Sequence, residues 1–339
     1  MKKNVILTDF DIPQGWAFPA ILAQATGEPW EAVGKVCNQP RTSAGIRVMR
    51  YVTYFMFPLK MVMRRKKLGS VIGWQQFFGL NFAFYQRLFG LKKVNDLTVM
   101  TFIYKRKGGL AGSIYHRYMR YIVTSRYVDR LICFSQEERD SYERLFGVEG
   151  KFLYTPLGDG NIPTKAQEEE ALGDDGYIFA PGRSNRNYDF LVELMAGMKY
   201  PLVVACDTYH RSSASDGVTV LNNCFGSDYQ SRLNRCHCVA IPLDDLHVSA
   251  GQLSIIQALR AGKPVICTLS DGAKDYVAQG DTGLLLPNDP RLWQDAISGI
   301  FENKKLYNDM CKKALKTYRE LYTDDAMFAR LARIIKDNS

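Results

Sequence analysis

The chain has 339 residues, of which 46% are hydrophobic and 23% are charged, so it is too apolar for a disordered protein and long enough for two ordinary domains. Its net charge of +9 is unevenly divided, because residues 1–160 hold 24 Lys and Arg against 12 Asp and Glu, whereas residues 161–339 hold 20 against 23. The N-terminal half is therefore expected to meet an anionic surface.

Apolar runs alternate with helical patterns along the whole chain. In the first half, strands are predicted at 4–9, 70–74, 97–104, 129–135 and 151–156, with helices at 16–26, within 41–66, and near 76–88, 112–125 and 136–146. In the second half, strands are predicted at 176–181, 201–206, 218–221, 237–243, 264–269 and 282–287, with helices at 187–198, 227–236, 249–262, 289–303, 304–322 and 324–337. This alternation predicts an α/β protein with two Rossmann-like domains.

An acidic segment that is poor in apolar residues, 164–176, separates the two halves and is interpreted as the linker. The predicted domains are therefore 1–163 and 164–323, followed by a C-terminal helix at 324–339. The eight cysteines are scattered, which favours reduced thiols in a cytoplasmic protein. The pair Cys236 and Cys238 lacks the spacing of a zinc site, and no metal is expected.

A basic stretch follows the first strand–helix unit. No acid lies between Glu31 and Asp96, and twelve Lys and Arg fall there, four of them in the run Arg64, Arg65, Lys66 and Lys67. The segment 47–68 interleaves these charges with Tyr, Phe and Met, and residues 72–93 add a second aromatic block. Such a pattern is typical of a helix in a membrane interface, while a core helix with a solvated basic face and a nucleic-acid surface are the alternatives.

Two arginines follow the first strand of the second half. In "APGRSNRNYDF" a Pro-Gly turn ends the strand, and Arg183 and Arg186 stand just before a helix. An arginine pair beside a helix N-terminus, at the carboxyl edge of a parallel sheet, could bind a diphosphate. The alternative is that both are ordinary surface residues.

The segment "SAGQLSIIQALRAGKPVI", 249–266, begins a second helix that suits an anion. Ser249 and Gln252 fit a capping box, in which Ser249 is simply the N-cap. Ala250 and Gly251 leave the first backbone N–H groups uncovered, so that an oxygen ligand could approach them. Gln257 is a polar exception on an apolar helix, and it either bonds to the protein itself or faces a ligand hydroxyl.

These motifs, together with "DYVAQGDTGLLLP", resemble the donor-binding domain of family 4 glycosyltransferases over residues 176–300, and residues 128–158 are similar to the end of that family's N-terminal domain. The resemblance implies two Rossmann-like domains facing each other in the B-type glycosyltransferase fold (GT-B), with the C-terminal helix crossing back to the N-terminal domain. It also implies a nucleotide diphosphate sugar as co-substrate, with no cofactor.

Carried over by position, the resemblance assigns the diphosphate to Arg183, with Arg186 as a substitute partner because Tyr188 stands where the family has a lysine. The backbone of Gly251, Gln252 and Leu253 would bind phosphate oxygens. The family's two glutamates fall on Ser249, near the transferred sugar, and on Gln257, at the ribose.

The N-terminal domain offers weaker candidates. Tyr104 and Lys105 follow the third predicted strand and would contact sugar or phosphate, while Gly15 and Trp16 occupy the first strand-to-helix loop. The histidine common in the family is absent there, and His116 and His247 are more simply explained as structural residues.

The predicted activity is transfer of a hexose to a glycan or lipid-linked acceptor in surface polysaccharide assembly, with retention of anomeric configuration and without metal. The protein would be cytoplasmic and associated with the inner face of the cell membrane through its anionic lipids, and it would not bind nucleic acid. The competing interpretation is a non-catalytic nucleotide- or membrane-binding protein of the same fold.

Overall fold

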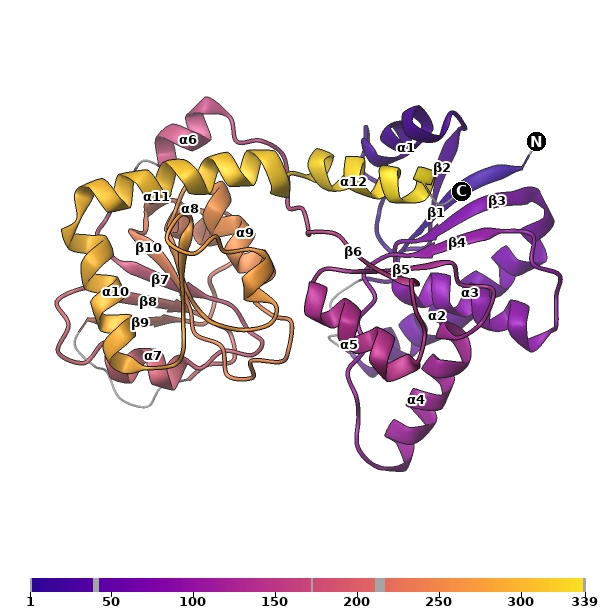
Figure 1. Ribbon diagram of the computed structural model, residues 1–339, viewed down its shortest axis with the longest axis horizontal. Helices are drawn as coiled ribbons and strands as arrows, with labels where there is room; N and C mark the ends of the chain where they lie inside the picture. The colour runs from indigo at the N-terminus through magenta and orange to yellow at the C-terminus, as the bar shows by residue number, and fades with distance from the viewer. Residues whose placement is uncertain (1, 39–42, 172, 211–216, 338–339) are drawn as a thin grey trace. The chain divides into compact units, whose positions relative to one another are not determined.

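The computed structural model describes residues 2–38, 43–171, 173–210 and 217–337. The chain forms two compact units: Met1–Thr155 with Phe328–Ser339, and Pro156–Met327. Most of the last helix therefore belongs to the N-terminal unit, and the division falls between Thr155 and Pro156, earlier than the predicted boundary after residue 163. Figure 1 labels the helices and strands of both units.

The N-terminal unit is built on a six-stranded parallel sheet. Its strands are β1 (Lys3–Thr8), β2 (Trp30–Gly34), β3 (Leu68–Gly73), β4 (Asp96–Val99), β5 (Arg130–Cys133) and β6 (Phe152–Tyr154). Its helices are α1 (Phe18–Thr26), α2 (Ala44–Met63), α3 (Gln76–Leu88), α4 (Gly109–Val123) and α5 (Gln136–Phe146), with a 3₁₀ turn at Arg65–Lys67 and most of α12 (Asp324–Asp337).

The second unit has a parallel sheet of the same size. Its strands are β7 (Ile178–Pro181), β8 (Leu202–Ala205), β9 (Val218–Leu221), β10 (Cys238–Ile241), β11 (Val265–Thr268) and β12 (Gly283–Leu286). Its helices are α6 (Lys165–Ala171), α7 (Tyr188–Leu194), α8 (Gly226–Arg235), α9 (Gln252–Arg260), α10 (Pro290–Glu302) and α11 (Lys304–Thr317), with a 3₁₀ turn at Ala273–Asp275 and a π turn at Tyr318–Tyr322.

Alternation along the strands divides the core of the second unit into two layers. Phe179, Val239 and Val265 pack with residues of α8 and α9 on one face, and Ile178, Cys238 and their neighbours pack with α7 and α10 on the other. Both faces of the sheet are thus buried, which explains why these strands are continuous apolar runs and not alternating ones. The prediction of two Rossmann-like domains is confirmed.

The strand order indicates the edge of the sheet at which a ligand is expected to bind. In the second sheet the order is β12-β11-β10-β7-β8-β9, so the chain leaves β7 in one direction and returns to build outward from β10 in the other. In doubly wound sheets ligands bind outside the carboxyl ends of the strands at this reversal point. The loops after β7 and β10 are therefore the first place to examine.

Three local predictions differ from the structure. The strand β2 was not predicted, because Trp30–Gly34 is short, half-exposed and interrupted by Glu31 at the edge of the sheet. The predicted linker contains the helix α6. The predicted strand 97–104 ends at Val99, since Thr101 adopts a left-handed conformation with φ 55° and turns the chain.

Candidate functional site

The loops after β7 and β10 are tied to each other at the reversal point. The side chain of Asn185 exchanges two hydrogen bonds with the backbone of Asp245, both 2.8 Å, and the Asn187 N–H donates to the Pro242 carbonyl at 3.0 Å. The two loops that carry the predicted donor motifs thus form one bonded edge within the second unit.

Arg183 lies on this edge with most of its side chain exposed. Its Nε is 3.4 Å from Oδ1 of Asp207, which follows β8, and the two side chains are 70% and 30% exposed. An exposed pair of this kind contributes little to stability, so the guanidinium can exchange its carboxylate for a ligand anion. The predicted position of Arg183 at an anion site fits this geometry.

Arg186 is held more firmly than its neighbour. Its guanidinium donates to the carbonyls of Pro181 and Ser184, at 3.2 and 2.9 Å, and to Oγ of Ser254 in α9 at 3.1 Å. Gly182 makes room for it, because a Cβ at that residue, where φ is 128°, would lie 2.5 Å from the guanidinium. Arg186 therefore supplies a fixed positive charge and joins the β7 loop to α9, with few donors left for a ligand.

Tyr188 occupies the position where the resemblance would place a lysine. Its side chain is buried and its hydroxyl donates to the Gly182 carbonyl at 2.6 Å. Burial raises the pKa of the Tyr188 phenol, so it stays a neutral donor. Tyr188 shapes the loop that carries Arg183 and makes no cationic contribution.

The N-terminus of α9 is open. Gly251 is the N-cap, with φ 90°, and no side chain of the described residues caps the helix. The first backbone N–H groups, those of Gln252, Leu253 and Ser254, therefore present their partial positive charge at the reversal point. This is the arrangement by which helices bind phosphate.

The predicted capping box is wrong. The helix begins after Gly251, so Ser249 lies outside it. The Gln252 side chain donates to Ser249 Oγ, which therefore does not accept from a backbone N–H of the first turn. The left-handed glycine causes this, since it turns the chain too sharply for a residue two positions earlier to reach the first N–H groups. Gly272 lies close to Ser249, because a Cβ at Gly272 would be 3.0 Å from both Cα and Oγ of Ser249.

A pocket of about 220 Å³ adjoins the edge. It is lined by Gly182, Arg183, Ala205, Cys206, Asp207, Leu221, Asn222, Cys224, Phe225 and Tyr229. The Tyr229 hydroxyl donates to Oε1 of Gln257 at 2.8 Å, so Gln257 bonds to a side chain and its amide stands beside this pocket. Burial raises the pKa of the Cys224 thiol to about 11, which keeps it protonated.

The sequence analysis missed Phe225 and Tyr229. Phe225 is 66% exposed at the N-terminus of α8, which is unusual for an aromatic side chain lining a pocket. The signal was present in "NNCFGSDY", where a phenylalanine stands between a strand and a helix at the carboxyl edge. An exposed ring there offers a flat surface to a planar ligand.

The comparison with protein families agrees with this geometry. Residues 169–303 match the family model described as glycosyl transferases group 1. The matched region includes both donor loops and the pocket, and a search of curated proteins finds no match.

Solved structures are similar in fold to this chain over its whole length. Anabaena Alr3699/HepE, in complex with UDP and glucose, has a TM-score of 0.63 at 13% identity over 99% of both chains. Sucrose-phosphate synthase from Thermosynechococcus elongatus has a TM-score of 0.68 at 16% identity, over 99% of both chains. A glycosyltransferase from Rickettsia africae has a TM-score of 0.65 at 11% identity, over 99% of this chain and 98% of that one. The predicted GT-B fold is thereby confirmed.

Tyr104 and Lys105, the candidates predicted after β4, differ in their exposure. Tyr104 is 6% exposed, and its hydroxyl is 2.9 Å from Nδ1 of His116, whose ring stacks on Phe146. Lys105 is exposed on the loop that leads to α4. Tyr104 and His116 thus belong to the packed interior of the N-terminal unit, and Lys105 remains the accessible residue of the predicted pair.

Trp16 belongs to an aromatic cluster. Its ring makes edge contacts with Phe10, Trp74 and Phe328, with centroids 5.2–6.2 Å apart. Phe328 comes from α12, so the cluster fastens the C-terminal helix to the N-terminal unit. Gly15 precedes it with φ 74° and exposed backbone.

The basic segment and the second aromatic segment of the N-terminal unit differ in how much of them is exposed. Arg64, Lys66 and Lys67 are exposed at the end of α2, and Arg65 is half-buried. The second aromatic block is core, because α3 is buried almost all round. Leu88 and Phe89, at the end of α3, are exposed exceptions. Exposed apolar residues on α2 include Val48, Met49, Val52, Phe55, Met56 and Met63. Among the described residues, no helix is long and apolar enough to cross a membrane.

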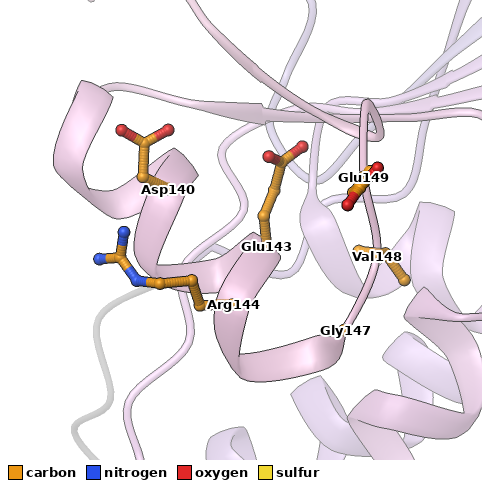
Figure 2. A pocket seen from close by; sticks show the side chains of 6 residues that line it. All are labelled: Asp140, Glu143, Arg144, Gly147, Val148 and Glu149. Atoms are coloured by element: carbon orange, nitrogen blue, oxygen red, sulfur yellow. The ribbon is translucent and has the colours of Figure 1, made fainter.

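A hollow of about 740 Å³ in the N-terminal unit is a different feature (Figure 2). It lies at the C-terminal end of α5, where Asp140, Glu143 and Glu149 line it beside Arg144. Because α5 returns from the carboxyl end of β5, this hollow lies at the amino edge of the sheet, and its acidic lining is unsuited to phosphate. In the part of the chain that the structure describes, no group of three His, Cys, Asp or Glu is placed to hold a metal ion.

Proposed function

We propose that this glycosyltransferase takes its sugar from a nucleotide diphosphate sugar bound at the β7–β10 reversal point. The observation that carries the proposal is the uncapped N-terminus of α9, which is bonded through Ser254 to Arg186 and stands on the same edge as Arg183. The HepE structures with UDP and with UDP-glucose support a donor of this class.

The proposed chemistry is electrostatic. As the bond between the anomeric carbon and the diphosphate breaks, negative charge grows on the leaving phosphate. The α9 N–H groups and the Arg186 charge are already oriented, so they stabilise that charge without reorganisation. Such a site needs no metal, and we propose retention of anomeric configuration without a protein nucleophile.

The neighbouring pocket would hold the nucleoside. The exposed Phe225 ring offers a stacking surface to the base, and the Gln257 amide, oriented by Tyr229, offers hydrogen bonds to ribose hydroxyls. Because Gln257 is neutral, each such bond is worth about 0.5–1.5 kcal/mol and adds no negative charge beside the diphosphate.

Thermal stabilisation by a panel of nucleoside diphosphates, followed by turnover of the matching nucleotide sugars, tests the proposal. Arg183→Ala should abolish the stabilisation. Arg235→Ala is the matched control, because Arg235 is also exposed and paired with an aspartate, Asp175, but lies at the C-terminal end of α8. Stabilisation without any turnover would favour a non-catalytic nucleotide-binding protein, and no stabilisation at all would refute the donor site.

We further propose a lipid-linked glycan acceptor, reached from the inner face of the cell membrane during surface polysaccharide assembly. The outer side of α2 exposes Val48, Val52 and Phe55 to solvent, and the helix ends in the basic run that begins at Arg64. Exposed apolar side chains flanked by positive charge suit an anionic lipid surface. No acid lies between Glu31 and Asp96 to oppose this attraction.

Flotation with vesicles containing or lacking anionic lipid tests the membrane proposal. Val52→Asp combined with Phe55→Asp, and charge reversal of residues 64–67, should each reduce binding to anionic vesicles. Leu292→Asp, which alters an equally exposed leucine on α10 of the other unit, is the control. Unchanged flotation of both variants would remove the membrane from the proposed function.

A further inference from the structure

A histidine–aspartate pair stands on the donor edge outside the predicted phosphate and nucleoside contacts. Nδ1 of His247 is 2.9 Å from Oδ2 of Asp271, and the other oxygen of Asp271 accepts from Lys274 at 3.0 Å. These bonds, that of His247 first, lower the pKa of Asp271, so the carboxylate is ionised and the imidazole N–H donates to it. The His247 side chain is 87% exposed.

The loop that carries His247 is rigidly attached to the diphosphate loop. The His247 N–H donates to the Asp245 carboxylate at 3.0 Å, and Asp245 is bonded through its backbone to Asn185, between Arg183 and Arg186. The Asp271 N–H donates to the Leu246 carbonyl at 3.0 Å. His247 is thus fixed from both sides before any ligand arrives.

Position limits what His247 can contact. Gly251, at the start of α9, is four positions further along the chain, a reach of at most about 14 Å. The sugar attached to the diphosphate extends over a similar distance. A side chain this close to the diphosphate-binding N–H groups can therefore contact the sugar. The nearer side chain, Ser249, is short and already accepts a bond from Gln252.

We propose that His247 binds a hydroxyl of the transferred sugar through Nε2, with Asp271 as the positioning residue. This inference rests on the proposed donor site. In the tautomer whose Nδ1–H donates to Asp271, Nε2 is an acceptor and can bond a hydroxyl of the sugar. The pair supplies an oriented acceptor beside the sugar, at a position where Ser249 brings no carboxylate.

Two conservative substitutions separate this role from a purely structural one. The amide of His247→Gln can reach the position of Nε2, whereas the amide of His247→Asn can reach only that of Nδ1 and keeps the bond to Asp271. Calorimetry first measures binding of UDP, GDP and ADP, and of UDP-glucose, GDP-mannose and ADP-glucose, to wild-type protein. The variants are then tested with the nucleoside diphosphate and the matching nucleotide sugar that bind most tightly.

We expect His247→Asn and His247→Ala to weaken nucleotide-sugar binding about three- to tenfold, with binding of the nucleoside diphosphate unchanged, and His247→Gln to restore most of the loss. Deoxy analogues of the donor sugar should reveal one hydroxyl whose removal weakens binding to wild type and has no effect on His247→Asn.

Other outcomes overturn the inference in distinguishable ways. If His247→Asn behaves as wild type while His247→Gln loses thermal stability, the pair only fastens the loop. If all variants bind nucleotide sugar as wild type does, His247 has no contact with the sugar. If wild-type protein binds no nucleoside diphosphate, the proposed donor site itself fails, and this inference fails with it.

Discussion

The guanidinium of Arg186 donates a hydrogen bond to Ser254 Oγ at 3.1 Å and thereby joins the loop after β7 to the first turn of α9. The two residues are 68 positions apart in the chain, and they lie in the segments that follow β7 and β10, the two strands that flank the reversal point. Their bond aligns a fixed positive charge with the helix N-terminus, and the anion site is made by this alignment and not by either motif alone.

Arg186→Lys should weaken nucleoside diphosphate binding about tenfold, because three different guanidinium nitrogens bond Pro181, Ser184 and Ser254. The single nitrogen of an ammonium cannot span these positions, so the loop loses its orientation. Calorimetric titration measures the change. Ser254→Ala removes one of these bonds only and should weaken binding a few-fold. Wild-type affinity in Arg186→Lys would show that these hydrogen bonds of Arg186 do not affect nucleoside diphosphate binding.

Asp207→Asn should tighten nucleoside diphosphate binding, by about two- to fivefold, because it removes the carboxylate that competes for Arg183 in the unliganded protein. The gain should be larger in low salt than at 0.5 M salt, since exposed charges are screened. Measurement of affinity at both ionic strengths checks this. Weaker binding in Asp207→Asn would instead make Asp207 a direct ligand contact.

Gly251→Ala should both destabilise the protein and impair the donor site. A left-handed conformation strains an alanine by about 1–2 kcal/mol, and the added Cβ would lie 3.3 Å from the Ile241 side chain. Gly280→Ala is the control, since Gly280 has φ 77° with nothing within 4 Å and lies away from the donor edge. Both variants should lose stability in denaturant unfolding, and Gly251→Ala alone should lose nucleotide affinity.

Lys263 should give the protein a rising stability at alkaline pH. Its side chain is 2% exposed, Nζ donates to the Gly173 carbonyl at 3.0 Å, and burial lowers its pKa below the ordinary 10.5. Between the lowered pKa and 10.5 the unfolded chain binds more protons than the folded one, so the free energy of unfolding increases with pH in that window and is flat, with respect to this group, below it.

Lys263→Met should remove this increase. Urea unfolding of both proteins from about pH 8 to pH 10.5 compares the two slopes. If the variant retains the wild-type slope, another group causes the pH dependence and Lys263 is charged in neither or both states.

Much of the architecture follows from local patterns. The apolar runs around Ile178, Val239 and Val265 are strands because residues buried on both faces of a sheet must be apolar without alternation. The turn at Gly182 and the small residues before Gln252 marked the two donor loops, since both depend on backbone conformations that few residues adopt.

Other features depended on residues far apart in sequence. Ser249 and Gln252 match a capping box, yet the left-handed Gly251 moves the start of α9, and Ser249 Oγ accepts from the Gln252 side chain instead of from its backbone N–H. The aromatic block that begins at Phe77 has the composition of an interfacial helix and proves to be core, because α2 and α4 pack against α3. Composition describes what a helix could bury, and only its neighbours decide what it does bury.

The sequence by itself determined the class of fold, the two donor loops and the asymmetry of charge, because these depend on the order and spacing of neighbouring residues. The tertiary structure decided which strand lies beside which, and through that the partners of Arg186, Gln257 and His247. Hydrogen bonds between Arg186 and Ser254, or His247 and Asp271, form across loops whose ends are brought together by strand pairing. No local pattern specifies such pairing, since its stability comes from burial of both faces of the whole sheet.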